Sequence, residues 1–187
     1  MGDKMIADAQ ALISATPPEL QLVNTRIILS PFSDDVNFAG YSFPAREECC
    51  SRDILLDWKE NRGFEKILNA YIHETGHSLA RLLSEKSGGE APVGFIEAIL
   101  RNPQAPSGYS IRGDLTSLRN RNEIQFEERF AEAFSIYIAT RYGQSGRGFD
   151  NYVEILEPHF AFFDQVIREL QQNPLERTPI TYFRERF

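Results

Sequence analysis

The chain has 187 residues, a formal net charge of −7 at pH 7, and 42% hydrophobic residues. This length and composition suit a single domain (1–187) with a hydrophobic core, and no apolar run approaches the ~20 residues needed to span a bilayer. The acidic balance leaves no basic stripe of the kind that binds nucleic acid, so we expect neither a nucleic-acid nor a membrane partner.

The N-terminal part, about residues 1–62, carries one helical pattern followed by strand patterns. Apolar residues from Lys4 to Ala15 recur with a helical period, and two prolines follow. Three segments rich in β-branched or alternating apolar residues predict strands: Leu20–Ser30, Val36–Pro44 and Arg52–Trp58. The adjacent Cys49 and Cys50 have the spacing of neither a disulfide framework nor a zinc ribbon.

Helical patterns dominate the rest of the chain. The predicted helices are about 64–86, 93–102, 123–142 and 150–172, the last with a kink at Pro158. A long loop with a short strand near Tyr109 should span 103–121, and an irregular tail should follow the last helix. Strands followed by helices predict an α+β domain: a small mixed sheet, a long helix (64–86) and a helical part (about 90–187).

Residues 73–77 read His-Glu-Thr-Gly-His and hold two of the three histidines in the chain. On a helix, His73 and His77 share one face, flanked by small residues and opposite the apolar arc. Two imidazoles at positions i and i+4 can bind one zinc ion. Glu74 projects ~100° to the side of His73, where it can touch a metal-bound water. We therefore predict a Zn²⁺ site with His73 and His77 as ligands and Glu74 as general base.

Catalytic zinc needs a third protein ligand and an open position. Glu128 and Glu132 share one face of the predicted helix 123–142, with Ala131 between them to allow close packing. Taken by themselves, two carboxylates on one helix face are typical of a solvent-exposed surface. Beside a histidine pair that lacks a third ligand, a bound metal would explain why both carboxylates lie on this face. We favour Glu128 as ligand and Glu132 as acceptor of a ligating ring N–H. Glu127, at the edge of the apolar arc, is less suited, and His159 is the alternative ligand.

The two motifs together resemble a known enzyme family. "HETGH" on one helix and "EERFAEAF" on a second resemble the gluzincin metallopeptidases, and more narrowly the catalytic domain of anthrax toxin lethal factor and the Pro-Pro endopeptidases. The resemblance implies a zincin-like fold in which His73, His77 and Glu128 bind zinc. It also implies that Glu74 is the general base and that Glu132 supports a ligand.

The specific part of this resemblance covers about Tyr71 to Tyr142 and departs from the family at one position. Family members carry an oxyanion-stabilising tyrosine seven residues before the ligating glutamate, where this chain has Arg121. We expect Arg121, Arg119 or a loop tyrosine such as Tyr109 to take that role. Preorganised donors of this kind are worth ~3–4 kcal/mol.

These patterns predict a zinc-dependent endopeptidase that binds a peptide or protein substrate as an extended strand. The strand edge that holds it would come from "YSFPA" or "DILLDW". Two alternatives stay open: a non-catalytic zinc-binding interaction domain derived from a metallopeptidase, and a toxin or effector protease specific for one host protein. A monomer is favoured. The resemblance implies a secreted or delivered protein, although no signal-peptide pattern begins the chain.

Overall fold

The computed structural model describes residues 2–15, 17–21, 23–24, 26–31, 40–42, 53–59, 63–102, 104–105, 107–111, 123–143, 152–175 and 181–183. Cys49, Cys50, Arg119 and Arg121 lie outside these ranges. The expectations for those four residues therefore stay predictions.

The described strands form one mixed sheet in the order β2-β3-β1-β4. β1 (Arg26–Ser30) pairs in parallel with both β3 (Asp53–Asp57) and β4 (Thr181–Phe183). β2 (Gly40–Ser42) runs antiparallel to β3 and forms one edge of this sheet. β3 is buried along its whole length, as expected for a strand paired on both sides. The mixed sheet and the α+β class are confirmed.

The helices follow the predicted pattern closely. They are α1 (Gly2–Ser14), η1 (Pro18–Leu20), α2 (Phe64–Lys86), α3 (Val93–Arg101), α5 (Glu123–Tyr142), α6 (Val153–Leu156), η3 (Glu157–His159) and α7 (Phe160–Gln172). Pro158 lies in η3, so the predicted kink is a 3₁₀ turn between α6 and α7. Gly88 and Gly143 follow α2 and α5 with φ of 70° and 66°, the left-handed conformation that ends helices.

Three local predictions were wrong. The strand expected from Leu20 begins only at Arg26, because the amide of Leu20 closes a 3₁₀ turn onto the carbonyl of Pro17 at 2.9 Å. Residues 107–111, where a short strand was expected near Tyr109, form turns and bends. In the tail, β4 completes the sheet by pairing with β1, a partner about 150 residues earlier that no local pattern indicates.

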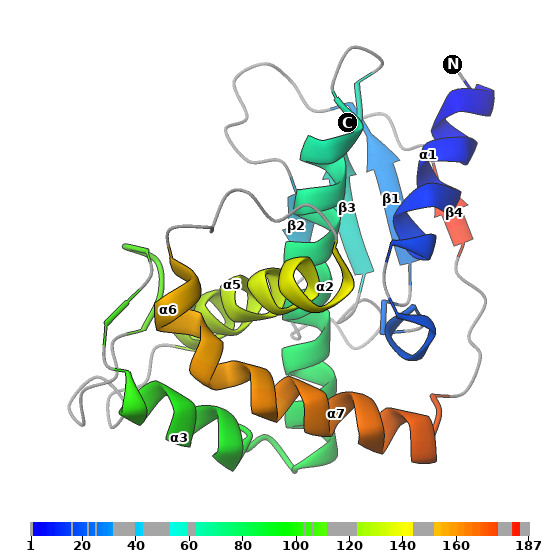
Figure 1. Ribbon diagram of the computed structural model, residues 1–187. Coiled ribbons are helices and arrows are strands. Elements are labelled where there is room, and N and C mark those ends of the chain that lie inside the picture. The colour runs from blue at the N-terminus through cyan, green and yellow to red at the C-terminus, as the bar shows by residue number, and fades with distance from the viewer. Residues whose placement is uncertain are drawn as a thin grey trace.

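Helix α2 connects the sheet to the helical half of the molecule (Figure 1). It begins beside β2 and β3, packs on both, and then crosses α5 at about its middle. Helix α5 is enclosed: every residue from Arg129 to Ile138 is buried, including the polar ones. Helix α5 packs against α2, as expected from the small residues on both helices.

The two long helices touch at Gly76 of α2 and Ala131 of α5. A Cβ atom added to Gly76 would lie only 2.7 Å from the Cα of Ala131 and 3.2 Å from its Cβ. No side chain fits at such a contact, so the crossing depends on glycine at this position. The sequence-based expectation that small residues would let another element approach the histidine face is borne out.

Gly76→Ala tests this crossing. We expect a loss of about 1–3 kcal/mol in the free energy of unfolding, because the added methyl group meets backbone that cannot rotate away. Urea denaturation measures the loss. Gly63→Ala is the matched control, since an added Cβ there meets nothing within 4 Å. Equal stability of the two variants would contradict the packing argument.

Candidate metal centre

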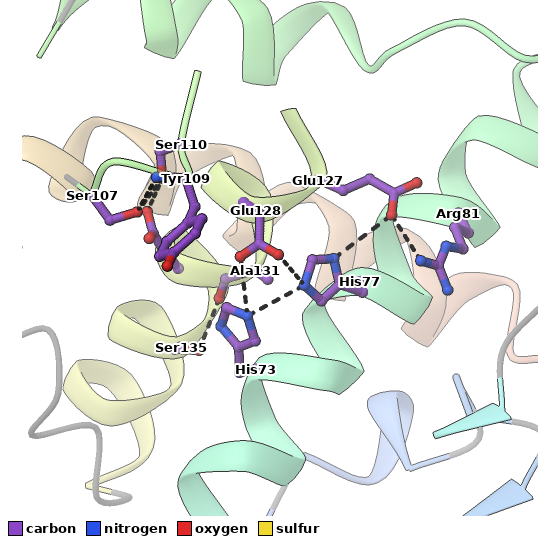
Figure 2. A network of polar contacts seen from close by, with 11 residues as sticks. His73, His77, Arg81, Ser107, Tyr109, Ser110, Glu127, Glu128, Ala131 and Ser135 are labelled. Carbon is purple, nitrogen blue, oxygen red and sulfur yellow. Dashed lines mark hydrogen bonds and ion pairs between the residues drawn. The ribbon is translucent and has the colours of Figure 1, made fainter. Parts of the chain in front are cut away.

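The crossing of α2 and α5 brings two imidazoles and a carboxylate together (Figure 2). The Nε2 atoms of His73 and His77 lie 3.2 Å apart. The carboxylate of Glu128 approaches both rings, with Oε2 3.4 Å from Nε2 of His73 and Oε1 3.6 Å from Nε2 of His77. His73, His77 and Glu128 therefore each present one ligand atom to a common point.

These separations fit a divalent metal ion. Zinc–nitrogen and zinc–oxygen bonds of about 2.0–2.2 Å at tetrahedral angles place neighbouring ligand atoms about 3.3–3.5 Å apart. The two ring nitrogens lie 3.2 Å apart, and each lies within 3.6 Å of a different oxygen of Glu128. With one ligand atom taken from each residue, all three atoms lie within 4.8 Å of one another. The donor set, two imidazoles and one carboxylate, is also one that zinc accepts in catalytic sites. The group can hold a metal ion, and its chemistry matches the predicted ligand set.

The ligands differ in their access to solvent. The side chain of His77 is 8% exposed, whereas those of His73 and Glu128 are 20% and 28% exposed. His77 thus anchors the group inside the crossing, and the other two ligands line its open side.

Charges around the group favour a cation. Burial acts to lower the pKa of His73, but the carboxylates of Glu128 and Glu74 outweigh it and raise that pKa above its ordinary value. Burial likewise acts to raise the pKa of Glu128, and the contact with His73 and the charge of His77 lower it overall. The cluster therefore has a negative potential that a divalent ion would neutralise.

Glu74 lies beside the ligand group. Its side chain is buried against the edge strand, where a Cβ added to Gly40 of β2 would lie 2.8 Å from Cγ and 3.0 Å from Oε1 of Glu74. Burial raises the pKa of Glu74, while His73 and His77 act in the opposite direction. Glu74 is thus coupled electrostatically to both rings without belonging to the ligand group, as predicted. Gly40 is a part of this arrangement that sequence reasoning missed.

The structure gives Glu132 a different partner from the predicted one. Its carboxylate accepts a hydrogen bond from the hydroxyl of Ser110, in the loop after α3. Burial raises the pKa of Glu132, and the hydroxyls of Ser107 and Ser110 counteract this. Glu132 lies one turn after Glu128 on α5, and its hydrogen bond to Ser110 connects the loop at 107–111 to this helix.

Glu127 lies beside His77 without forming a hydrogen bond to it. Its Oε2 atom lies 3.7 Å from Nδ1 of His77, the ring nitrogen that faces away from the ligand group, and 2.9 Å from the guanidinium of Arg81. The sequence carries one signal for this arrangement. Arg81 follows His77 by four residues, as His77 follows His73, so the three side chains form one stripe along α2.

Arg129 anchors the loop that holds Tyr109. Its guanidinium donates to the carbonyls of Gln104 at 2.6 Å, Asn102 at 2.8 Å and Ile111 at 3.2 Å. The side chain is fully buried, and burial lowers its pKa to about 10, so it stays charged at neutral pH. Tyr109 itself is 78% exposed. Its predicted role at the oxyanion stays a prediction, as does that of Arg121.

His159, the alternative ligand, does not belong to the metal-binding group. It is fully buried, stacks on Phe95 with ring centroids 4.2 Å apart, and accepts a hydrogen bond from Nε of Arg129 at 3.4 Å. Burial, together with the charge of Arg129, lowers its pKa to about 3. His159 is thus a neutral core residue.

The chain matches no family model, no curated protein and no solved structure. None of the helices in the described ranges combines the length and apolar character that a bilayer crossing requires. The family resemblance seen in the sequence therefore stays an expectation, and the functional argument rests on the geometry of the site.

The buried His159 predicts a pH-dependent loss of stability. An unfolded histidine takes up a proton below pH ~6.5, whereas folded His159 stays neutral until about pH 3, so acidification favours unfolding by ~1.4 kcal/mol per pH unit in between. His159→Gln removes this titration and keeps an acceptor for Arg129. Between pH 7 and pH 5, we expect the wild type to lose about 2 kcal/mol more than the variant in urea denaturation with chelator present. Parallel pH profiles would contradict this assignment.

Proposed function

We propose that the protein is a zinc-dependent endopeptidase with a zincin-like fold. The observation that carries the proposal is the convergence of His73, His77 and Glu128 from two crossing helices, with one ligand atom of each within 4.8 Å of the others. A carboxylate that does not ligate, that of Glu74, lies beside this point. Three ligands, an accessible fourth position and an adjacent acid are the parts that metal-assisted hydrolysis requires.

Each side chain has a defined task in this proposal. When bound, zinc would polarise the scissile carbonyl and lower the pKa of a bound water toward ~7. Glu74 accepts the proton of that water and passes it to the leaving amine. Burial against Gly40 restricts the rotamers of Glu74 and so holds the carboxylate ready for both transfers.

The edge strand β2 is the proposed substrate-binding strand. Of the two segments considered from the sequence, "DILLDW" forms β3, which pairs with β1 and β2 and so offers no edge. Within the described sheet, β2 is the edge beside Glu74. An extended peptide added to β2 would place its backbone next to the proposed base.

The composition of the group argues against a purely structural zinc site. Structural sites are usually closed by four protein ligands. Among the described residues, the group that could hold a metal has three members, and two of them are partly exposed. This favours a catalytic role over a non-catalytic zinc-binding domain. An effector protease specific for one host protein would use the same chemistry. That alternative therefore differs from the proposed function only in its substrate.

Glu74→Gln separates catalysis from metal binding. We expect cleavage of a mixed peptide library, followed by mass spectrometry, to fall by about 10²–10⁴-fold, because the amide cannot accept the proton. Zinc content should be unchanged. Glu128→Gln is the control, which should lose both zinc and cleavage. Native-rate cleavage by Glu74→Gln would refute the mechanism.

Gly40→Ala tests the packing of the proposed base. The added methyl group would lie 2.8 Å from Cγ of Glu74 and must displace that side chain. We expect slower peptide cleavage with unchanged zinc affinity, measured by chelator competition. Gly63→Ala, which adds the same methyl group in open space, should leave both quantities unchanged. Native-rate cleavage by Gly40→Ala would show that the strand does not position Glu74.

A further inference from the structure

A polar chain leads away from the metal-binding group on its buried side. It runs from His77 of α2 to Glu127 of α5 and back to Arg81 of α2 (Figure 2). Arg81 and His77 are both buried, and Glu127 is partly buried between them. Neither Arg81 nor Glu127 is needed to hold the metal or to carry out hydrolysis in the proposal above.

The ring of His77 lies between two consecutive carboxylates. Nε2 faces Oε1 of Glu128 at 3.6 Å and Nε2 of His73 at 3.2 Å, while Nδ1 faces Oε2 of Glu127 at 3.7 Å. A neutral imidazole has one N–H donor and one lone pair. At 3.7 Å the Glu127 carboxylate is beyond direct hydrogen-bond distance of Nδ1, but its charge favours a proton on that nitrogen. That tautomer leaves the lone pair of Nε2 for a metal.

Arg81 explains why Glu127 performs this task while its neighbour Glu128 ligates. Its guanidinium holds Oε2 of Glu127 at 2.9 Å, on the far side of His77 from the ligand group. Arginine keeps its charge at all relevant pH values, so the attraction is permanent. It offsets the repulsion between adjacent carboxylates and keeps Glu127 away from the metal position.

We propose that Arg81 and Glu127 act as a positioning pair that fixes the ring orientation and tautomer of His77 and thereby sets the affinity of the site for divalent metal. This inference rests on the metal ligands of the proposed function and adds two residues that determine how tightly they bind. The partners of metal-ligating histidines commonly account for 10–100-fold in metal affinity.

The test measures zinc affinity by chelator competition for the wild type, Glu127→Gln, Arg81→Met and the double variant. We expect each single variant to bind zinc about 10–100-fold more weakly, and the double variant to bind no more weakly than the weaker single variant, because both act through His77. Arg141→Met is the matched control. It breaks another Arg–carboxylate pair, with Asp164 at 3.2 Å, and should leave zinc affinity unchanged.

A second measurement keeps the inference falsifiable if a variant does not fold. In zinc-bound wild-type protein, long-range ¹⁵N–¹H NMR spectra should show His77 protonated at Nδ1. Protonation at Nε2, or zinc affinities in Glu127→Gln and Arg81→Met equal to that of the wild type, would overturn the positioning role alone. If the wild type binds no zinc, the proposed function fails and this inference fails with it.

Discussion

The site depends on one contact between two helices. Gly76 and Ala131 let α2 and α5 approach until backbone meets side chain. His73 and Glu128 lie three residues before Gly76 and Ala131, respectively, and His77 directly follows Gly76, so all three members of the candidate metal centre lie next to this contact. A larger side chain at the contact would separate the helices by an ångström or more, which is comparable to the tolerance of a metal coordination sphere.

Burying charged side chains between two helices costs desolvation free energy unless each charge has a hydrogen-bond or ion-pair partner. Here the partners come from the opposite helix or from the loop packed on it. Arg81 of α2 holds Glu127 of α5, Arg129 holds three loop carbonyls, and Glu132 accepts from Ser110. The polar side chains of α5 thus face three different neighbours. Glu128 faces the candidate metal position, Glu127 contacts Arg81 of α2, and Arg129 and Glu132 contact the loop.

This distribution explains which parts of the site could be predicted from the sequence. The spacing of His73, Glu74 and His77 is a local property of one helix, so their shared face and the sideways position of Glu74 follow from helix geometry. The choice among Glu127, Glu128 and Glu132 is not local. The helical wheel separated Glu128 from the apolar arc correctly, but it treated the rest of α5 as amphipathic. Because α5 is buried from Arg129 to Ile138 and packs against both α2 and the loop at 107–111, the partners of Glu127 and Glu132 depend on which element lies against each face.

The sequence alone determined the α+β class, most of the helical segments, the position of β3 and the shared face of His73 and His77, and the helical wheel favoured Glu128 as their partner. These follow from periodicity and spacing, which act over a few residues. Only the tertiary structure decided that β4 pairs with β1, that β2 is the edge beside Glu74, that His159 is a core residue, and that Glu127 lies between His77 and Arg81. Each of these is a contact between segments far apart in the chain, and no local pattern specifies which of several polar or apolar partners packing will bring together.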